Sequence, residues 1–297
     1  MKIRIGSRGS DLALWQAHFV KDELEKNGHE VEIKIIVTRG DKIQDLSFDK
    51  IEGKGFFTKE IEESLLNNEI DLAVHSHKDL ETTNPAGLMI GAVSYRANPA
   101  DVLLINKDAY NNINVLDIKE NAIIGTSSAR RQTQIRRLRP DVELRELRGN
   151  VPTRINKLRE GQYDGIVLAA AGIDRLELDL SDLEVLELTP TSFIPAPAQG
   201  VLGLQIREDD VALKEALSVL HNEEVANKIA IERAVLKQMN GGCQLPLGVY
   251  CIKEESDWVV YTSYANSKEE VAEVNSYQTD ELDGLVDLIV SDLNTNE

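Results

Sequence analysis

Strand-like and helix-like segments alternate along the first two thirds of the chain, and this order most limits what the chain can fold into. Short apolar runs typical of buried strands are followed by amphipathic runs typical of helices, with Gly, Pro and Asn between them. The alternation predicts βαβ units and α/β domains with largely parallel sheets. The expected strands are 2–6, 31–37, 71–75, 102–105, 122–125, 142–147 and 165–169, and the expected helices are 10–27, 57–67, 128–138 and 152–160.

These segments form two groups that resemble each other. Residues 3–10 and 123–130 each contain a strand that ends in Gly, then Ser or Thr, then the start of a helix. Asp71 and Asp164 each open an apolar strand. Two such halves predict a central cleft with helix N-termini that can bind anions. Any two α/β units share these features, so the repeat by itself is weak support.

The last third of the chain has a different pattern. A Pro-rich crossover leads into residues 196–206, which we expect to return as a strand to the first α/β domain. The remaining segments predict a small α+β domain with an antiparallel sheet. They are helices near 210–220 and 224–239, strands 246–251, 258–264 and 272–277, and a final helix at 280–293. The expected domains are 1–97 with 197–215, then 98–196, then 216–297.

The charge of the chain is negative overall but uneven. With 33 Lys and Arg against 51 Asp and Glu, the net charge of −18 predicts repulsion of nucleic acid and anionic membranes. Residues 126–175 instead hold eleven basic and six acidic residues. The planar guanidinium groups of arginines concentrated in one segment are suited to binding carboxylates or phosphates. For five of these arginines, a position on a solvated helix face is an equal alternative; they are Arg136, Arg137, Arg139, Arg145 and Arg159. Arg139 in particular is expected on such a face.

Several classes of protein are not expected. No run approaches 18 apolar residues, and the first residues lack the features of a signal peptide, so we expect a cytoplasmic protein. Cys243 and Cys251 match neither a disulfide framework nor a zinc site. The five histidines are scattered apart from His75 and His77, which are expected in one strand, and no metal site is expected.

Two segments carry candidate reactive groups. Cys243 follows two glycines in a turn between a helix and a strand, where a thiol can act as a nucleophile or an attachment point, although a lone cysteine is more often buried and inert. Cys251, inside an apolar strand, fits the inert case. Ser76, Lys78 and Asp79 follow a buried strand, where α/β proteins bind ligands. That carboxylate could stabilise a cation or move a proton; a solvated turn with a local ion pair is the alternative.

Three helix starts have the composition of anion sites. Residues 126–131 combine hydroxyl groups with Arg130 and Arg131 at a predicted helix start. Residues 148–154 again place arginines at a helix start, with Pro at the first helical position. Residues 7–10 form a smaller version, and residues 52–56 could be a lid with glycine hinges. The chain contains no nucleotide-binding fingerprint.

Taken together, these motifs resemble the porphobilinogen deaminase (hydroxymethylbilane synthase) family, in order and spacing over nearly the whole chain. They are GSRGSDLALWQ, GKGFFTKEIE, DLAVHSHKDL, GTSSARRQTQIRRLRP, LRGNVPTRINKL, AAAGIDRL, PAPAQGVLG and GGCQLPLG. The resemblance implies a transferase of tetrapyrrole (haem, porphyrin) biosynthesis, monomeric and free of metal. It also implies two α/β domains like those of type II periplasmic binding proteins and a small C-terminal α+β domain.

The resemblance further implies a covalent cofactor and a small-molecule substrate. A dipyrromethane would be attached through a thioether to Cys243, and four porphobilinogens would add head to tail, each losing ammonia, before water releases hydroxymethylbilane. Each porphobilinogen ring carries an acetate and a propionate. The arginines concentrated in residues 126–175 of this acidic protein are suited to binding these carboxylates.

By the same resemblance, Asp79 is the catalytic residue and the other motif residues bind ligands. The implied cofactor-binding residues are Cys243, Ser10, Lys78, Asp79, Thr126, Ser128, Arg130, Arg131, Arg148 and Gly149. The implied substrate-binding residues are Arg8, Lys54, Ser76, Arg148, Asn150, Arg154, Arg175 and Gln199. Three positions depart from the common pattern: His77, where Met is frequent; Glu81, where Pro is frequent; and Gln205, where an acid is usual.

Two alternatives belong to other functional classes. One is a protein of the type II periplasmic fold that binds a small anion without catalysis, against which the third domain and the cysteine turn argue. The other is an inactive relative that serves as an interaction protein, against which the presence of Asp79, Cys243 and the arginines argues.

Overall fold

The computed structural model describes residues 1–42, 58–242 and 244–295. The chain divides into two compact units, which are described separately below. Unit 1 contains Met1–Ala97 and Gly200–Asn227, and unit 2 contains Asn98–Gln199 and Lys228–Glu297. The finer division into three domains stays a prediction.

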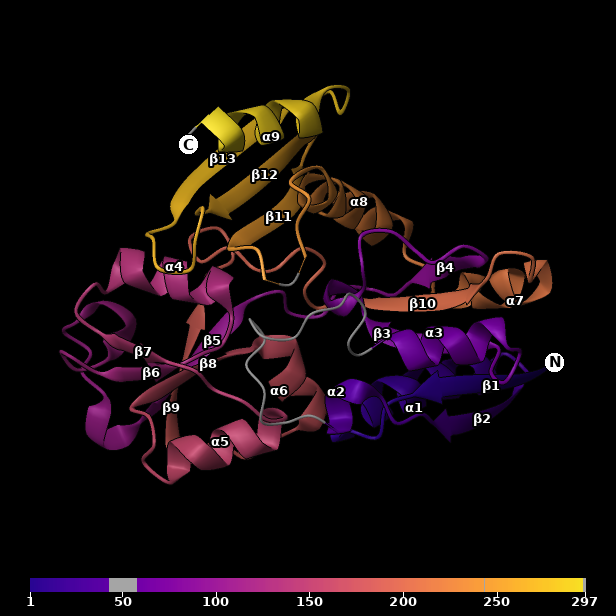
Figure 1. Ribbon diagram of the computed structural model, residues 1–297, viewed down its shortest axis with the longest axis horizontal. Helices are drawn as coiled ribbons and strands as arrows, with labels where there is room; N and C mark the ends of the chain where they lie inside the picture. Colours follow the sequence, from indigo (N-terminus) through magenta and orange to yellow (C-terminus); the bar gives the residue numbers. More distant parts are fainter. Residues whose placement is uncertain (43–57, 243, 296–297) are drawn as a thin grey trace. The chain divides into compact units, whose positions relative to one another are not determined.

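Unit 1 is built on a five-stranded mixed sheet (Figure 1). Its elements are β1 (Lys2–Ser7), α1 (Asp11–Lys26), β2 (Glu30–Ile35), α2 (Arg39–Lys42), α3 (Lys59–Leu66), β3 (Leu72–Ser76), the 3₁₀ helix η2 (His77–Asp79), β4 (Leu88–Val93), β10 (Leu202–Arg207), α7 (Val211–Ala216) and the 3₁₀ helix η5 (Leu217–Leu220). The strand order is β2–β1–β3–β10–β4, and β10 runs antiparallel to both of its neighbours. The prediction that a late strand returns to the first α/β domain is therefore confirmed.

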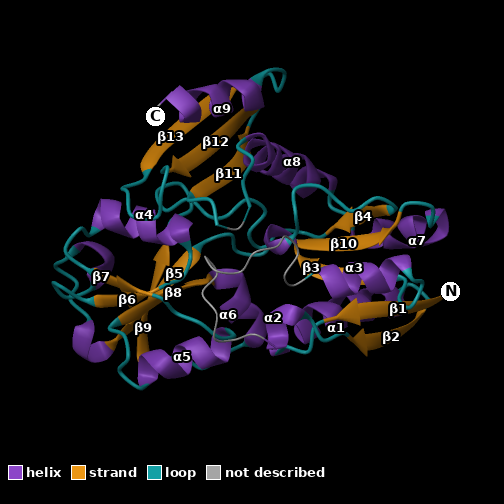
Figure 2. Ribbon diagram, viewed as in Figure 1, coloured by secondary structure: helices purple, strands orange, loops and turns teal. Residues whose placement is uncertain are grey.

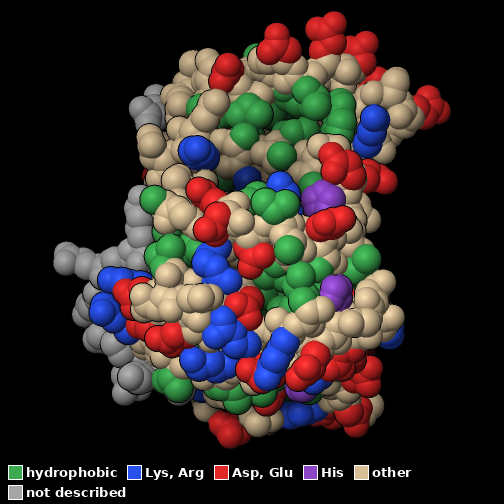
Figure 3. All heavy atoms as spheres, turned by 90° about the vertical axis from the view of Figure 1, so that its right-hand side faces the viewer, with side chains coloured by type: hydrophobic (Ala, Val, Ile, Leu, Met, Phe, Trp, Pro, Cys, Tyr) green, Lys and Arg blue, Asp and Glu red, His purple; other side chains and the backbone are tan. Residues whose placement is uncertain are grey.

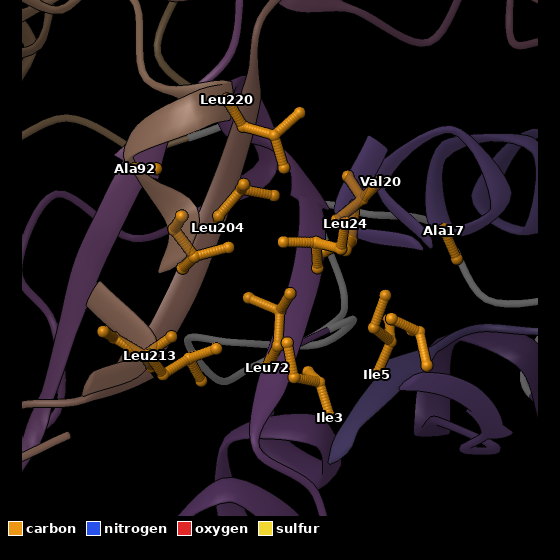
Figure 4. Packing of buried hydrophobic residues seen from close by; sticks show 14 of the residues in the cluster. Ile3, Ile5, Ala17, Val20, Leu24, Leu72, Ala92, Leu204, Leu213 and Leu220 are labelled. Atoms are coloured by element: carbon orange, nitrogen blue, oxygen red, sulfur yellow. The ribbon is translucent and has the colours of Figure 1, made fainter. Parts of the chain in front are cut away.

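Helices cover both faces of this sheet. On one face, α1 contributes Ala17, Val20 and Leu24 to a core that includes Ile3 and Leu204 (Figure 4). On the other face, Ile61 and Leu65 of α3 pack on a smaller cluster. Burial on both faces is why the central strand β3 begins with an uninterrupted apolar run, Leu72–Val74.

Unit 2 repeats the arrangement (Figure 2). Its α/β elements are β5 (Asp101–Asn106), η3 (Lys107–Ala109), η4 (Val115–Asp117), β6 (Ile123–Gly125), α4 (Ala129–Leu138), β7 (Glu143–Arg145), α5 (Val151–Arg159), β8 (Gly165–Ala169), α6 (Ala170–Leu176) and β9 (Leu183–Leu188). The order β7–β6–β8–β5–β9 has one antiparallel strand, β5, in the same position as β10 in unit 1. The predicted similarity of the two α/β halves is confirmed by this shared topology.

The sheet of unit 2 also has two buried faces. Along β5, Val102 and Leu104 join the core beneath α5, whereas Leu103 and Ile105 join the core beneath α4. This alternation follows from the two-residue period of a strand. It explains why the segment is apolar without interruption.

The two aspartates that open strands have the same structural role. Asp71 donates its backbone N–H to the carbonyl of Arg4, and its Oδ2 accepts from the Arg4 N–H at 2.9 Å. Asp164 forms the same pair of bonds with Ile123, where Oδ2 accepts from the N–H at 2.8 Å. Each carboxylate therefore fastens two neighbouring parallel strands, β1 to β3 in unit 1 and β6 to β8 in unit 2.

The C-terminal part of unit 2 is a three-stranded antiparallel sheet covered by two helices. Its elements are α8 (Glu223–Gln238), which begins in unit 1, β11 (Leu247–Glu254), β12 (Asp257–Tyr264), β13 (Glu273–Thr279) and α9 (Leu285–Thr295). It packs against the α/β part of the same unit, since a Cβ at Gly248 would lie 2.6 Å from the carbonyl oxygen of Ile194. The predicted small α+β fold is confirmed.

Some expected elements differ from the structure. Strands β4 and β9 and helix α6 were not expected, and residues 196–200 precede β10 as a turn rather than as part of the strand. The expectation that His75 and His77 share a strand is wrong, because β3 ends at Ser76 and His77 begins a 3₁₀ helix. Both rings are nevertheless buried.

Acidic and basic side chains are interspersed on the face shown in Figure 3. The negative net charge is therefore not gathered into one acidic patch on that face. Among the described residues, no helix combines the length and the apolar character needed to cross a membrane.

The placement of Arg139 on a solvated helix face is wrong. Its side chain is buried at the end of α4. Nη1 donates to the carbonyls of Val115 and Ile118 at 2.8 Å each, and Nη2 donates to the carbonyl of Lys119 at 2.9 Å. The guanidinium also pairs with Asp141 at 2.6 Å. Arg139 therefore fastens the η4 segment to the end of α4.

We expect Arg139→Leu to lower the free energy of unfolding by about 3 kcal/mol or more, because each buried acceptor left without a donor costs about 1–3 kcal/mol. Arg145→Leu is the matched control, since Arg145 is half exposed and pairs with an exposed Glu143. The control should change stability by about 1 kcal/mol at most. Urea unfolding of both variants tests this, and equal effects would contradict the structural role of Arg139.

Candidate functional site

The turn after β3 presents the candidate catalytic group in unit 1. Ser76 ends the strand, and Asp79 closes the 3₁₀ helix with its side chain exposed. The turn is held by a bond from the His77 N–H to the carbonyl of Val201 at 2.9 Å and by the buried side chain of Leu80. These bonds hold the backbone of the turn, and the exposed Asp79 carboxylate is accessible to a ligand.

The hydroxyl groups near this turn have defined partners. Gln16, buried on α1, donates from Nε2 to Ser76 Oγ at 2.8 Å. Ser10 is the N-cap of α1, and its Oγ accepts from the Ala13 N–H at 3.4 Å. Ser10 therefore has a capping role, and Gln16 is a supporting residue that the sequence analysis did not single out.

In unit 2, the start of α4 has the features of an anion site. Ser128 is the N-cap, and its side chain makes no capping hydrogen bond. Thr126 is buried and its Oγ1 accepts from the Ser128 N–H at 3.2 Å, which stabilises the turn into the helix. The N–H groups of the first helical turn and the Ser128 hydroxyl are therefore oriented as donors to a negative group.

The two arginines of the first turn of α4 point inward to Asp101. Arg130 Nη1 donates to Asp101 Oδ2 at 2.7 Å, and Arg131 Nη2 donates to Oδ1 at 2.7 Å. The guanidinium groups also donate to backbone carbonyls, from Arg130 to Ile194 and from Arg131 to Val167. All three charged side chains are buried.

Gln199 completes this cluster. Its Nε2 donates to Asp101 Oδ1 at 3.0 Å and to the carbonyl of Pro99 at 2.8 Å. Burial alone would raise the pKa of Asp101, but the charges and hydrogen bonds of Arg130 and Arg131 outweigh burial and hold that pKa well below its usual range. The carboxylate therefore stays charged and balances one of the two guanidinium charges.

The start of α5 forms a second arginine-rich loop. Asn150 is the N-cap and accepts from the Thr153 N–H at 2.9 Å. Gly149 has φ of +114°, and a Cβ there would lie 2.6 Å from Thr153 Cγ2, so the position requires glycine. Arg154 Nε donates to the carbonyl of Gly149 at 2.7 Å, and Arg148 pairs with Glu146 at 3.6 Å. Both guanidinium groups therefore lie beside the same helix N-terminus.

Three other residues were also predicted to bind cofactor or substrate. Arg175 is buried on α6. Lys54 and Cys243 lie outside the described residues. Cys251, by contrast, is 1% exposed in β11, as expected of a structural cysteine.

Asp101 is the functional-site residue that the sequence analysis missed. A signal was present, because Asp101 opens an apolar strand as Asp71 and Asp164 do. Its partners lie about 30 and 98 positions further along the chain, so nothing local links them. Gln16 was within a recognised motif but had no assigned partner.

Comparison with known families gives matches along most of the chain. Residues 3–215 match the family described as "Porphobilinogen deaminase, dipyromethane cofactor binding domain". Residues 226–270 match the family described as "Porphobilinogen deaminase, C-terminal domain".

Curated relatives carry the same name. The chain is 44% identical to porphobilinogen deaminase of Maridesulfovibrio salexigens over 265 residues, covering 89% of this chain and 84% of the relative. It is 47% identical to that of Trichlorobacter lovleyi over 252 residues, with coverages of 84% and 78%. It is 44% identical to that of Shouchella clausii over 268 residues, with coverages of 90% and 85%.

Among solved structures, the chain is similar to periplasmic binding proteins. An ABC transporter periplasmic substrate-binding protein from Coxiella burnetii has a TM-score of 0.45 at 15% identity, covering 78% of this chain and 96% of that one. An arginine-specific periplasmic binding protein from Salmonella typhimurium has a TM-score of 0.42 at 14% identity, with coverages of 76% and 96%.

We expect Arg131→Leu to destabilise the fold, because it removes one of two buried cations that compensate Asp101. Breaking a buried ion pair costs about 3–5 kcal/mol. Arg148→Leu is the comparison, since its side chain is 20% exposed and its ion pair with Glu146 is long, so the loss should stay near about 1 kcal/mol. Denaturant unfolding measures both, and an unchanged midpoint for Arg131→Leu would show that the Asp101 cluster does not stabilise the unit.

Proposed function

The chain belongs to the porphobilinogen deaminase family, and we propose that it condenses four porphobilinogens head to tail, with loss of ammonia, and releases hydroxymethylbilane by hydrolysis. The observation that carries this proposal is the match to both family domains, including the dipyrromethane cofactor domain over residues 3–215. A protein that binds small anions without catalysis is not favoured, since the curated relatives are porphobilinogen deaminases.

We propose that the dipyrromethane is attached through a thioether to Cys243. The neighbouring residues support this choice, because Asn240, in the turn after α8, has φ of +52°, and a Cβ at Gly242 would meet no atom within 4 Å. A turn of this kind can present a side chain to a ligand. The other cysteine, Cys251, is buried and unsuited to carry a large group.

The donors of unit 2 fit the carboxylates of cofactor and substrate. Acetate and propionate groups require cations and N–H donors, which the starts of α4 and α5 supply together with Arg148 and Arg154. Arg130 and Arg131 each carry five N–H donors, so the bonds to Asp101 and to the carbonyls of Ile194 and Val167 leave some N–H groups for a further carboxylate. The proposal assigns these groups to binding and orientation, with Thr126, Ser128, Gly149, Asn150, Arg175 and Gln199 supporting them.

The turn residues of unit 1 carry the chemistry in this proposal. When bound, the cofactor would supply a nucleophilic pyrrole carbon that attacks the electron-poor carbon from which the substrate has lost ammonia. Loss of ammonia makes the substrate pyrrole electron-poor and cationic, and the fixed Asp79 carboxylate stabilises that positive charge and accepts from the pyrrole N–H. Lys78, Arg8, Ser10 and Ser76 bind substrate or cofactor carboxylates, and Lys54 is assigned the same role.

We further propose a cytoplasmic monomer that acts on a small molecule and binds neither nucleic acid nor membranes. The net charge of −18 supports the last two points, because it repels other polyanions.

The attachment point is tested by intact mass. The purified protein should exceed its sequence mass by two pyrrole units, and Cys243→Ser should remove that excess because the thioether sulfur is lost. Cys251→Ser is the matched control and should keep the excess. An adduct that persists in Cys243→Ser would refute the assignment.

The catalytic group is tested by turnover of cofactor-loaded variants. Asp79→Asn keeps the shape but removes the charge, so turnover should fall by about a thousandfold or more while the protein stays folded. Asp79→Glu keeps the charge with one more methylene and should retain measurable activity. Near-normal turnover in a loaded Asp79→Asn enzyme would move the catalytic role to another acid.

A further inference from the structure

A polar pair lies inside the otherwise apolar face of the unit 1 sheet that α3 covers. In the antiparallel pair of β3 and β10, His75 is opposite Gly203 and Ala73 is opposite Gln205. Residues directly opposite share a face, so the side chains of His75 and Gln205 are diagonal neighbours. His75 is 6% exposed and Gln205 is fully buried.

These two side chains belong to a continuous chain of hydrogen bonds. His75 Nε2 lies 3.1 Å from Gln205 Oε1, and Gln205 Nε2 donates to Glu62 Oε1 on α3 at 3.1 Å. Gln205 Nε2 also donates to Asn84 Oδ1 at 3.4 Å, and Thr58 Oγ1 donates to the other oxygen of Glu62 at 3.5 Å. Glu62 is itself buried. Strand β3, strand β10 and helix α3 are thus joined by side chains.

The carboxylate of Glu62 sets the donor-to-acceptor direction along this series of hydrogen bonds. A carboxylate offers only acceptors, so the amide of Gln205 must turn its NH₂ group toward Glu62 and its oxygen toward His75. An amide oxygen also only accepts, so the proton on the His75 ring must be at Nε2. The identity of one buried amide therefore fixes the tautomer of the ring.

The same strand supports the turn that carries Asp79. A Cβ at Gly203 would lie 2.9 Å from Leu80 Cδ1 and 3.1 Å from His77 Cδ2, so the turn packs closely on β10 at this glycine. His75 is the residue before Ser76, which pairs with Leu202 of β10. Movement of the His75 ring would therefore be transmitted directly to the backbone that leads into the turn.

The charges around His75 keep the ring neutral. Burial lowers the pKa of His75 to about 4, the hydrogen bond to Gln205 acts in the opposite direction, and the nearby positive charge of Arg8 lowers the pKa further. The carboxylate of Glu62 faces the ring from α3, but the amide of Gln205 stands between them. An acid at position 205 would instead place a negative charge beside the ring and a second carboxylate beside Glu62.

We propose that Gln205 is a positioning residue for the reaction: its amide holds His75 as a neutral ring that donates through Nε2, and so keeps the strand end that presents Ser76 and Asp79 in one geometry. This inference rests on the proposed function, because it takes the turn after β3 to be catalytic. Gln205 acts through His75 and touches no substrate in this account.

The first test is the state of the His75 ring in the holoenzyme, read from spectra of ¹⁵N-labelled histidine and assigned by loss of the signal in His75→Asn. The wild-type ring should be neutral with its proton on Nε2 from about pH 5 to 8. Glu62→Gln removes the acceptor that orients the amide, so it should give a mixture of tautomers. A wild-type ring that titrates near its ordinary pKa, or that carries its proton on Nδ1, would overturn the proposal.

The second test links this ring to turnover through Gln205→Glu. The nearly isosteric acid should raise the pKa of His75 by about two units or more, so Nδ1 becomes protonated at pH values where it carries no proton in the wild type. The pH profile of kcat should then gain one titration at the midpoint seen in the spectra, with kcat about tenfold lower on its acid side. KM for porphobilinogen should change little, because the arginines that bind carboxylates are untouched.

Controls separate this role from general effects. Gln162→Glu adds the same charge at an exposed position of unit 2 and should leave both the His75 spectrum and the pH profile unchanged. If Gln205→Glu charges the ring while kcat follows the wild type at every pH, the positioning role is refuted. Wild-type protein without any deaminase activity would instead contradict the proposed function itself.

Discussion

Two guanidinium groups that meet on the buried carboxylate of Asp101 are the interaction on which unit 2 depends. Asp101 opens β5, the strand that lies between β8 and β9, and Arg130 and Arg131 open α4. The same carboxylate accepts from Gln199, which ends the crossover toward β10. One side chain thereby fixes a sheet strand, a helix start and a chain crossover, and removing a single partner leaves charge uncompensated where water cannot reach it.

This interaction also constrains how the unit can bind anions. Because Arg130 and Arg131 in the first turn of α4 are held by Asp101, the N–H groups of that turn and the Ser128 hydroxyl have a fixed direction. At the next helix, Gly149 and Asn150 achieve the same result with a positive φ and a side-chain cap. Fixed donors lose little entropy when they bind carboxylates, which suits an enzyme that must hold a lengthening chain of pyrroles.

Much of the fold could be predicted because it follows from local patterns. The strands and helices of both α/β halves show their periods in sequence, and Asp71 and Asp164 marked equivalent strand starts. Arg139 could not be placed, because its burial depends on carbonyls about 20 positions earlier that converge only in the folded chain. The partners of Asp101 and Gln205 could not be predicted for the same reason, since each side chain meets residues distant in sequence. Strand β9 (LEVLEL) has its two glutamates three residues apart, a spacing that also fits a helix.

Assembly of the tetrapyrrole on Cys243 is tested most directly by the mass of the protein during turnover. Holoenzyme would be mixed with limiting porphobilinogen, quenched in acid, and analysed intact and as peptides. We expect a ladder of covalent species, each one pyrrole unit heavier than the last and up to four units above the resting enzyme, with all added mass on the peptide that contains Cys243. Product formed without any such ladder, or added mass on a different peptide, would contradict assembly of the tetrapyrrole at this cysteine.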